Sequence, residues 1–248
     1  MTDTPFVLLP PSQGKAEGGR GRFRPRTGSF AGLAAQRREV LDALGAVLGD
    51  DPDLASMLFG AEGPLLDRAI GSVERLVAGR APVMPGAARF TGVVWDHLAP
   101  STLDDTCLER LIVPSALLGA VTGADPTPDH RLTFTVSVPG LGRLDRWWRS
   151  ELTEAVIDLV GGRPVVEMLP TEHQRALDLD EVAATATVVR VRFVSRTGTR
   201  AVGHAAKAVK GIAARTVLTE GLGALGDLAW EGWSARSVAD DRIEIVAP

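Results

Sequence analysis

A run of basic side chains near the C-terminal end of the chain has the spacing of one helix face. Placed at 100° per residue, residues 200–218 separate into an arc of small apolar side chains and an arc of cations. The cationic arc consists of Arg200, His204, Lys207, Lys210 and Arg215. No acidic residue occurs between Arg190 and Thr219, so no partner at helical spacing relieves the repulsion among these charges. The pattern is typical of an anion-binding surface or of an ordinary solvated face.

Two further segments carry groups that can hold an anion. Arg190 and Arg192 precede the basic helix in a strand-like segment, and their spacing of two residues puts both side chains on one face. Near the N-terminus, the loop from Pro10 to Lys15 follows a short apolar run, and the backbone N–H groups of such a loop can hold a phosphate. The loop is not a Walker A motif, because Ala16 follows the lysine instead of Ser or Thr. We expect either an anion-contacting loop or a plain turn.

The acid–base candidates are His204 and Glu172. An imidazole titrates near neutral pH, and cationic neighbours favour its neutral, basic form. In an enzyme these two residues would be the general acid or base. The other histidines are His97, His130 and His173, and no two of the four have the i, i+4 spacing of metal ligands on a helix. The sequence therefore predicts no metal site and no cofactor.

The elements that must position these groups alternate between strands and helices. Strand patterns are present at 6–9, 132–138, 165–168, 186–194 and 243–246. Helical patterns are present at 33–48, 54–59, 64–77, 105–121, 152–160 and 200–218. This interleaving predicts a mixed α/β (α+β) fold, with one mixed sheet surrounded by helices.

Composition limits the class of protein. The chain has 248 residues, of which 45% are hydrophobic, enough for one large core. The net charge of −4 argues against a protein that coats nucleic acid through overall positive charge. Cys107 is the sole cysteine, which excludes a disulfide framework and predicts a buried thiol in a reducing compartment. No apolar run approaches the roughly 20 residues that span a bilayer, so we expect a cytoplasmic protein without a membrane partner.

Three local features have both structural and functional interpretations. Residues 16–28 are rich in Arg and Gly without periodicity, which predicts a mobile loop that a polyanion could order. Residues 54–78 resemble a helix-hairpin-helix, whose turn amides can contact a nucleic-acid phosphate, although Glu62 in the turn would repel one and favours a plain turn. Trp147 and Trp148 can stack on a base or anchor the helix that follows.

Several segments, taken in chain order, match one family pattern. Residues 7–15 resemble its opening, 88–98 its Arg-Tyr-Thr-Gly segment, 111–119 its Ser-Gly-Leu-Tyr-Gly segment, 130–132 its Tyr-Arg-Leu segment and 204–215 its basic helix. On these segments the chain resembles a divergent member of the YaaA family, the peroxide stress resistance family. The chain contains no tyrosine. Phe90, Trp95, Leu118 and His130 stand where family members often have an aromatic hydroxyl.

The resemblance implies one compact α/β domain over residues 1–248 with a positively charged cleft and a helix-hairpin-helix-like element. It also implies DNA binding and a role in peroxide stress through control of free iron. Carried over by position, the cleft would be lined by Lys15, Arg89, Thr91, Arg131, His204, Lys207 and Lys210.

Two functional hypotheses follow. In the first, the chain is a DNA-binding stress protein, and the phosphates are contacted by Arg192, Lys207, Lys210 and Arg215. In the second, it is an enzyme for a small anionic substrate such as a nucleotide, a phosphate ester or a carboxylate, with specialised metabolism as one setting. The anion would then be held by Lys15, Arg131, Lys207 and Lys210. The missing tyrosines strengthen the second hypothesis, and we expect a monomer in either case.

Overall fold

A mixed eight-stranded sheet forms the centre of the computed structural model, which describes residues 4–48 and 52–248. The order of the strands across the sheet is β10-β11-β12-β9-β8-β1-β3-β4. Their bounds are β1 Phe6–Leu8, β3 Leu111–Ser115, β4 Gly119–Thr122, β8 Val165–Glu167, β9 Val188–Val194, β10 Ala229–Trp230, β11 Trp233–Ala239 and β12 Arg242–Val246. Two small antiparallel pairs accompany it, β2 (Val83–Pro85) with β5 (Pro126–Pro128) and β6 (Ser137–Val138) with β7 (Gly142–Arg143).

The strands from β12 to β3 run parallel to one another. β1 pairs in parallel with β3 on one side and with β8 on the other, and Leu8 is in register with Ile112 and Glu167. β9 continues the parallel block, whereas β4, β11 and β10 are antiparallel to their neighbours. The carboxyl ends of β1, β3 and β8 therefore meet at one edge of the sheet.

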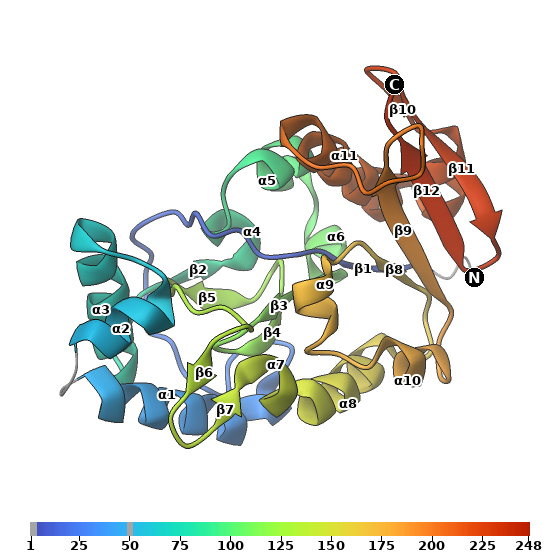
Figure 1. The fold of residues 1–248 in the computed structure, drawn as a ribbon. Coiled ribbons are helices and arrows are strands. Elements are labelled where there is room, and N and C mark those ends of the chain that lie inside the picture. The colour runs from blue at the N-terminus through green and yellow to red at the C-terminus, as the bar shows by residue number, and fades with distance from the viewer. Residues whose placement is uncertain (1–3, 49–51) are drawn as a thin grey trace.

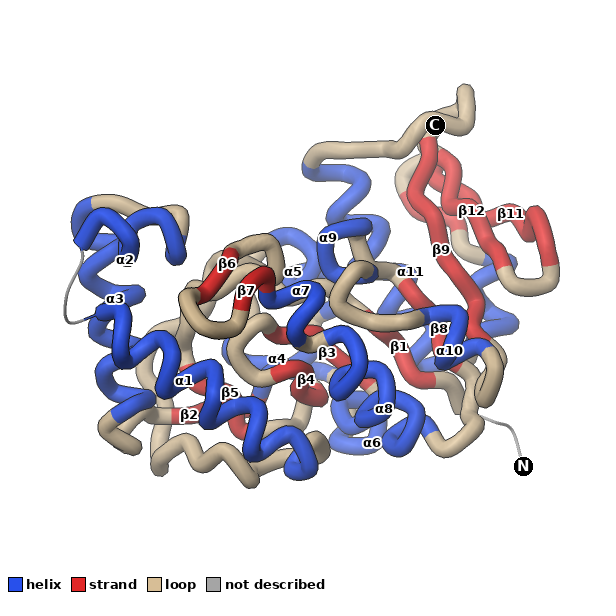
Figure 2. Tube along the Cα trace, turned by 60° about the horizontal axis from the view of Figure 1, so that its bottom comes forward, coloured by secondary structure: helices blue, strands red, loops and turns tan. Residues whose placement is uncertain are grey.

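Helices cover both faces of the sheet. In Figure 1, α1 (Ala34–Leu48) and α8 (Arg149–Val160) lie on the lower side of the molecule, and α5 (Val93–Leu98) and α11 (His204–Glu220) lie on the upper side. The hairpin of α2 (Pro52–Phe59) and α3 (Gly63–Val77) lies at the opposite end from the β9–β12–β11 ribbon in both views (Figure 1, Figure 2). The shorter helices are α4 Gly86–Arg89, α6 Asp105–Glu109, α7 Leu144–Trp147, α9 Thr171–Gln174 and α10 Leu179–Ala183, with 3₁₀ turns η1 Ala31–Leu33, η2 Pro100–Thr102 and η3 Leu222–Asp227. In the described part of the chain no helix is long and apolar enough to cross a membrane.

The mixed α/β class predicted from the sequence is confirmed, and so are most of the long elements. The predicted strands at 6–9, 165–168, 186–194 and 243–246 correspond to β1, β8, β9 and β12. The predicted helices at 33–48, 54–59, 64–77, 152–160 and 200–218 correspond to α1, α2, α3, α8 and α11. α11 begins after Gly203, whose φ of 96° cannot continue a helix, so Arg200 precedes the helix instead of belonging to it.

Two predicted elements are wrong. The helix expected at 105–121 ends with α6 at Glu109, and the rest forms the β3–β4 hairpin. β-Branched residues favour a strand there, and Pro114 and Gly119, with a φ of 76°, disfavour a helix. The strand expected at 132–138 is a loop with a turn at residues 134–135, of which only Ser137–Val138 pairs with another strand. The alternation in the sequence reflects the burial of Leu132, Phe134 and Val138. Leu132 and Phe134 are buried in the loop and do not pair with another strand.

Arg37 is a fixed part of the core. It lies on α1, is 1% exposed, and donates hydrogen bonds to the carbonyl oxygens of Leu118 and Ala120 at 2.8 and 3.0 Å. Its remaining donors bind the carbonyls of Pro25 and Thr27. A buried guanidinium is tolerated only when its donors have acceptors. Through these bonds Arg37 joins α1 to the β3–β4 hairpin and to the loop that precedes α1.

Candidate anion-binding site

A cavity with a volume of about 410 Å³ opens at the carboxyl ends of β1, β3 and β8. The loop after β1 contributes Pro11, Ser12, Gln13 and Lys15, and β3 contributes Ser115 at its end. Glu172 and His173 belong to the segment after β8. The far wall comes from the end of α2 and from residues 130–136.

The position of the cavity matches the place where open parallel sheets bind ligands. The chain leaves β1 and returns at β3 on one side, and it leaves β8 and returns at β9 on the other side. The two loops therefore diverge and leave a crevice above the β1–β8 pair. Ligands of open α/β sheets bind at such switch points, outside the carboxyl ends of the strands.

Lys15 brings an amine to this crevice. Its Nζ donates to the carbonyl oxygen of Ser12 at 3.0 Å and lies 5.7 Å from the centre of the Phe90 ring. Burial lowers the pKa of Lys15 to about 8. Asp129 opposes this shift, and the charges of Arg131, Arg89 and Arg68 add to it. The amine thus stands among cations in a poorly solvated place, where an anionic ligand would be attracted.

Arg131 lines the same cavity, and its charge contributes to the lowered pKa of Lys15. Its Nε donates to the carbonyl oxygen of Phe59 at 3.1 Å, which fixes the side chain against the end of α2. Its two terminal nitrogens have no hydrogen-bond partner among the described residues. The free edge of a guanidinium matches the two oxygens of a carboxylate or a phosphate.

Ser115 and His130 form a buried pair in the cavity wall. The Oγ of Ser115 lies 3.1 Å from the Nε2 of His130, and the N–H of Leu132 points to Nδ1 at 3.4 Å. Burial, together with the charges of Lys15 and Arg89, lowers the pKa of His130 well below its ordinary value. We assign a neutral ring with the proton on Nε2, because Nδ1 is the acceptor. Sequence reasoning missed Ser115 because it fell inside a predicted helix.

Glu172 and His173 occupy another part of the wall. The Glu172 side chain is 58% exposed, and its Oε1 lies 3.5 Å from the Nδ1 of His173. That Nδ1 is buried and has no hydrogen-bond partner in the described structure. Burial lowers the pKa of His173 to about 4, with a further contribution from Lys210, so the ring is neutral at pH 7. His173 received no role from sequence reasoning beyond its place among the dispersed histidines.

The remaining lining is largely apolar. Leu58 and Phe59 from the end of α2 face the cavity, as do Leu132, Phe134 and Val136. The edge of the Phe134 ring contacts His173 at a centroid distance of 5.8 Å. A ligand that fits this cavity therefore has an apolar part as well as an anionic group.

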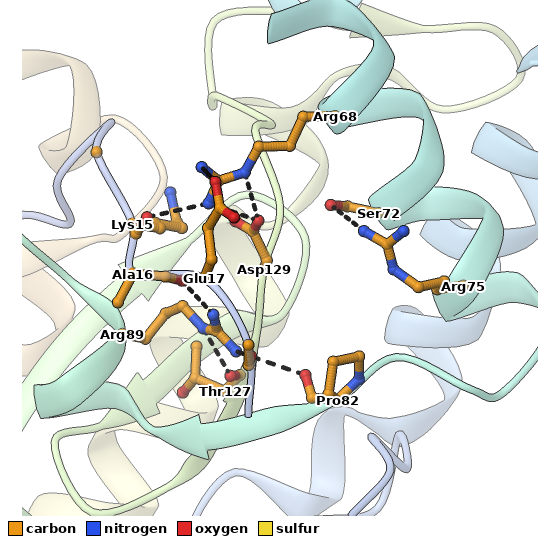
Figure 3. A network of polar contacts seen from close by, with 12 residues as sticks. Lys15, Ala16, Glu17, Arg68, Ser72, Arg75, Pro82, Arg89, Thr127 and Asp129 are labelled. Carbon is orange, nitrogen blue, oxygen red and sulfur yellow. Dashed lines mark hydrogen bonds and ion pairs between the residues drawn. The ribbon is translucent and has the colours of Figure 1, made fainter. Parts of the chain in front are cut away.

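A network of ion pairs lies behind Lys15 (Figure 3). Arg68 on α3 binds Asp129 at 2.8 Å and Glu17 at 2.7 Å, and it donates to the carbonyl oxygen of Lys15 at 3.0 Å. Two smaller cavities, of about 190 and 200 Å³, flank Arg68 and Asp129. The network holds the loop after β1 against α3, and this contact fixes the backbone of Lys15.

Arg89 lies beneath this network and is fully buried (Figure 3). Its guanidinium donates to the carbonyls of Ala16, Gly18 and Thr127. The resemblance placed Arg89 in the lining of a cleft, but these bonds use its donors to anchor the start of the Arg/Gly-rich segment. The segment is fixed further along as well, because Phe23 is buried and Arg20 pairs with Val83. Thr91 lines the 190 Å³ cavity, and its N–H donates to the Oγ of Ser12 at 3.0 Å.

The cations of the basic helix α11 have different surroundings, and none of them lines the 410 Å³ cavity. Lys210 points to the sheet, donates to the carbonyl oxygen of Met168 at 2.8 Å, and has its pKa lowered to about 8 by burial, against the attraction of Glu167. Arg215 donates to the carbonyl oxygen of Leu98 and to the hydroxyl of Thr102. His204 and Lys207 are exposed, and neither lines the cavity.

Three other residues that the sequence analysis singled out have contacts within the fold. Arg192 pairs with the fully buried Glu167 at 2.9 Å. Trp148 is fully buried and donates from Nε1 to the carbonyl oxygen of Ala116, so its ring is an anchor and is not available to stack on a base. Cys107 is buried, as the sequence predicts. Among residues 4–48 and 52–248, no group of three His, Cys, Asp or Glu side chains has a geometry that could hold a metal ion.

Comparison with known proteins places this architecture among bacterial relatives. The model of the family described as peroxide stress protein YaaA matches residues 6–237. A UPF0246 protein of Streptomyces coelicolor is 34% identical over 223 residues, which cover 87% of this chain and 84% of the relative. A UPF0246 protein of Corynebacterium efficiens is 32% identical over 218 residues, which cover 86% of this chain and 85% of the relative.

Proposed function

The chain belongs to the peroxide stress protein YaaA family, and we propose that it binds a small anionic molecule in the cavity at the carboxyl ends of β1, β3 and β8. The anion is held between the Lys15 amine and the Arg131 guanidinium. Ser115 donates its hydroxyl proton to the same ligand, and the apolar wall receives the rest of the molecule.

The observation that carries this proposal is the pair of cations, Lys15 and Arg131, that line one cavity with donors unused by the fold. Lys15 has a single acceptor, the Ser12 carbonyl, and Arg131 uses only its Nε. By contrast, the guanidinium of Arg89 is bound on all three nitrogens, Arg192 is paired with the buried Glu167, and Arg215 is held by Leu98 and Thr102. None of these three arginines lines the cavity. Burial disfavours the charged form of the Lys15 amine although Asp129 opposes this effect, and a bound anion would stabilise that charged form.

If the protein is an enzyme, the acid–base group of this cavity is Glu172, assisted by His173. Both residues line the cavity, whereas His204 is exposed on α11 and outside it. A carboxylate 3.5 Å from a neutral imidazole can exchange a proton with a bound ligand through one of the two groups.

Calorimetric titration with phenyllactate, an aromatic carboxylate, tests the proposal. Replacing Arg131 by Ala removes a charge-assisted contact worth about 1.5–3 kcal/mol, so we expect the affinity to fall at least roughly tenfold. The matched control is Arg196→Ala, which removes an exposed arginine outside the cavity and should leave the affinity unchanged. Equal losses in both variants, or an absence of binding by the native chain, would contradict the cavity as the site.

DNA binding is the second candidate, and two features support it. The helices α2 and α3 are joined by the short turn that the sequence predicts, and the exposed His204 and Lys207 form a basic strip at the start of α11. Arg200 adds a third basic side chain just before the helix. Phosphate contacts by such a strip would bind DNA without base specificity.

Fluorescence anisotropy with duplex, bulged and single-stranded DNA at low salt separates the two candidates. Under the DNA hypothesis, Lys207→Ala weakens DNA binding and reduces its salt dependence, while the titration with phenyllactate is unchanged. If no DNA binds at low salt, the second candidate is excluded and the first is unaffected. Survival of a deletion strain in hydrogen peroxide, with free iron measured alongside, tests the role in stress that family membership suggests under either candidate.

A further inference from the structure

Lysine is scarce in this chain, and one lysine lines the cavity. Lys and Arg together number 27, yet the lysines are only Lys15, Lys207 and Lys210. Lys207 is exposed on α11, and the amine of Lys210 donates to the Met168 carbonyl outside the cavity. A cation for anion binding alone can be an arginine, as elsewhere in this chain. A primary amine can also act as a nucleophile, which a guanidinium cannot.

We propose that the amine of Lys15 forms a Schiff base with the carbonyl carbon of a bound 2-oxo acid that carries an apolar side chain. This inference rests on the proposed anion site and names the chemical class of its ligand. In a 2-oxo acid the reactive carbonyl is bonded directly to the carboxylate. A guanidinium that holds the carboxylate therefore places the carbonyl beside a neighbouring amine.

The residues around Lys15 fit each part of such a molecule. Arg131, which lines the same cavity, offers its two free terminal nitrogens to the carboxylate. The hydroxyl of Ser115 accepts hydrogen bonds from His130 and from the Leu118 N–H, so its own proton is available to the carbonyl oxygen. Phe59 and Phe134 line the apolar side of the same cavity and can pack on the side chain of the ligand.

The protonation state of Lys15 favours the addition. Only a neutral amine attacks a carbonyl, and an ordinary lysine is almost entirely protonated at neutral pH. Burial, with the charges of Arg131, Arg89 and Arg68, lowers the pKa of Lys15 to about 8 even though Asp129 opposes the shift. About half of the Lys15 side chains are therefore neutral at pH 8.

The step balances without an oxidant or a reductant. The lone pair of Nζ adds to the carbonyl carbon, and the carbonyl oxygen takes up a proton to give a carbinolamine. The carbinolamine then loses its hydroxyl group and one nitrogen proton as a molecule of water, which leaves a C=N bond to Lys15. Glu172 is the acid–base group on the cavity wall that can bring the proton to the departing hydroxyl.

Trapping with sodium cyanoborohydride tests the inference. The full chain is incubated at pH 8 with phenylpyruvate and the reductant, and the modified lysine is located by peptide mass spectrometry. We expect modification of Lys15 at least tenfold above that of Lys210, whose pKa is also about 8 but whose amine lies outside the cavity. Excess phenyllactate, which has no carbonyl group, should protect Lys15. Lys15→Arg has no primary amine at this position, so it should lose the adduct.

The outcomes separate this inference from the proposed function. If phenyllactate binds but phenylpyruvate yields no adduct, or modifies the three lysines equally, the Schiff base is overturned and the anion site stands. If neither acid binds in calorimetry, both proposals fail. The location of the adduct in the native chain is read directly from peptides, so it decides the question even if the Lys15→Arg chain does not fold.

Discussion

The Oγ of Ser115 lies 3.1 Å from the Nε2 of His130, with both residues buried in the cavity wall. The pair resembles the serine and base of a hydrolase in distance alone. The Nδ1 of His130 accepts from the Leu132 N–H, which puts the ring proton on Nε2 and makes the histidine a donor to Ser115. A histidine that already donates to the serine cannot remove its proton. The hydroxyl proton of Ser115 is therefore free for another acceptor, and we expect Ser115 not to act as a nucleophile.

Replacing Ser115 by Ala should cost about 1 kcal/mol of unfolding free energy, because Nε2 of His130 loses its acceptor. Urea denaturation measures this change, with Ser195→Ala on an exposed turn as the control, for which we expect a change within about 0.5 kcal/mol. A fluorophosphonate probe should leave native Ser115 unlabelled. Labelling that disappears in Ser115→Ala would show that the serine is activated after all.

Anion binding should weaken as the pH rises through about 8, the pKa of Lys15 in the free protein. The protonated amine attracts the carboxylate, and loss of the proton removes that attraction while phenyllactate keeps its charge. Calorimetry between pH 6.5 and 9.5 measures the effect. The Lys15→Arg chain, whose charge persists over this range, should show a flat profile. The same downward slope in both chains would assign the titration to another group.

Arg89 should be essential for folding and not specifically for binding. Arg89→Lys leaves the carbonyls of Gly18 and Thr127 without their donors, which should cost about 2–4 kcal/mol of unfolding free energy. The control is Arg26→Lys, at an exposed residue of the same loop. A variant of native stability that had lost phenyllactate binding would return Arg89 to the ligand site.

The close crossing of α5 and α11 depends on Gly211. A Cβ at this position would lie 2.2 Å from the carbonyl oxygen of Val94, so Gly211→Ala forces the helices apart and should cost about 1–3 kcal/mol. Gly32→Ala is the control, since a Cβ there meets nothing within 4 Å. Thermal unfolding compares the two. Equal melting temperatures would mean that the helices part without cost.

Four of the five parallel strands, β1, β8, β9 and β12, could be predicted from the sequence, because they read as short runs rich in β-branched residues such as Val188–Val194. The cavity could not be predicted, because it is assembled from segments far apart in the chain whose meeting depends on strand order. The error at 105–121 hid the end of β3 and therefore Ser115. Reading Pro114 and Gly119 as strand and turn residues would have exposed that end.

For the basic helix α11, the element could be predicted from the sequence but its contacts could not. Its periodicity correctly predicts a helix, but a charge at helical spacing does not reveal what the charge contacts. Lys210 reaches the carbonyl of Met168, just after β8, and Arg215 reaches the carbonyl of Leu98 in α5, and only the fold brings those carbonyls near. Lys15 and Arg131, which the family resemblance implies as cleft residues, both line the cavity.

The central claim is that one anion binds between Lys15 and Arg131, and a crystal structure grown with 4-bromobenzoate tests it most directly. Anomalous scattering locates the bromine atom independently of any interpretation of the density. The account predicts the carboxylate between the Lys15 amine and the Arg131 guanidinium, with the bromine directed toward Phe134 and the apolar wall. A bromine peak beside Lys207 on α11, with the cavity empty, would contradict it.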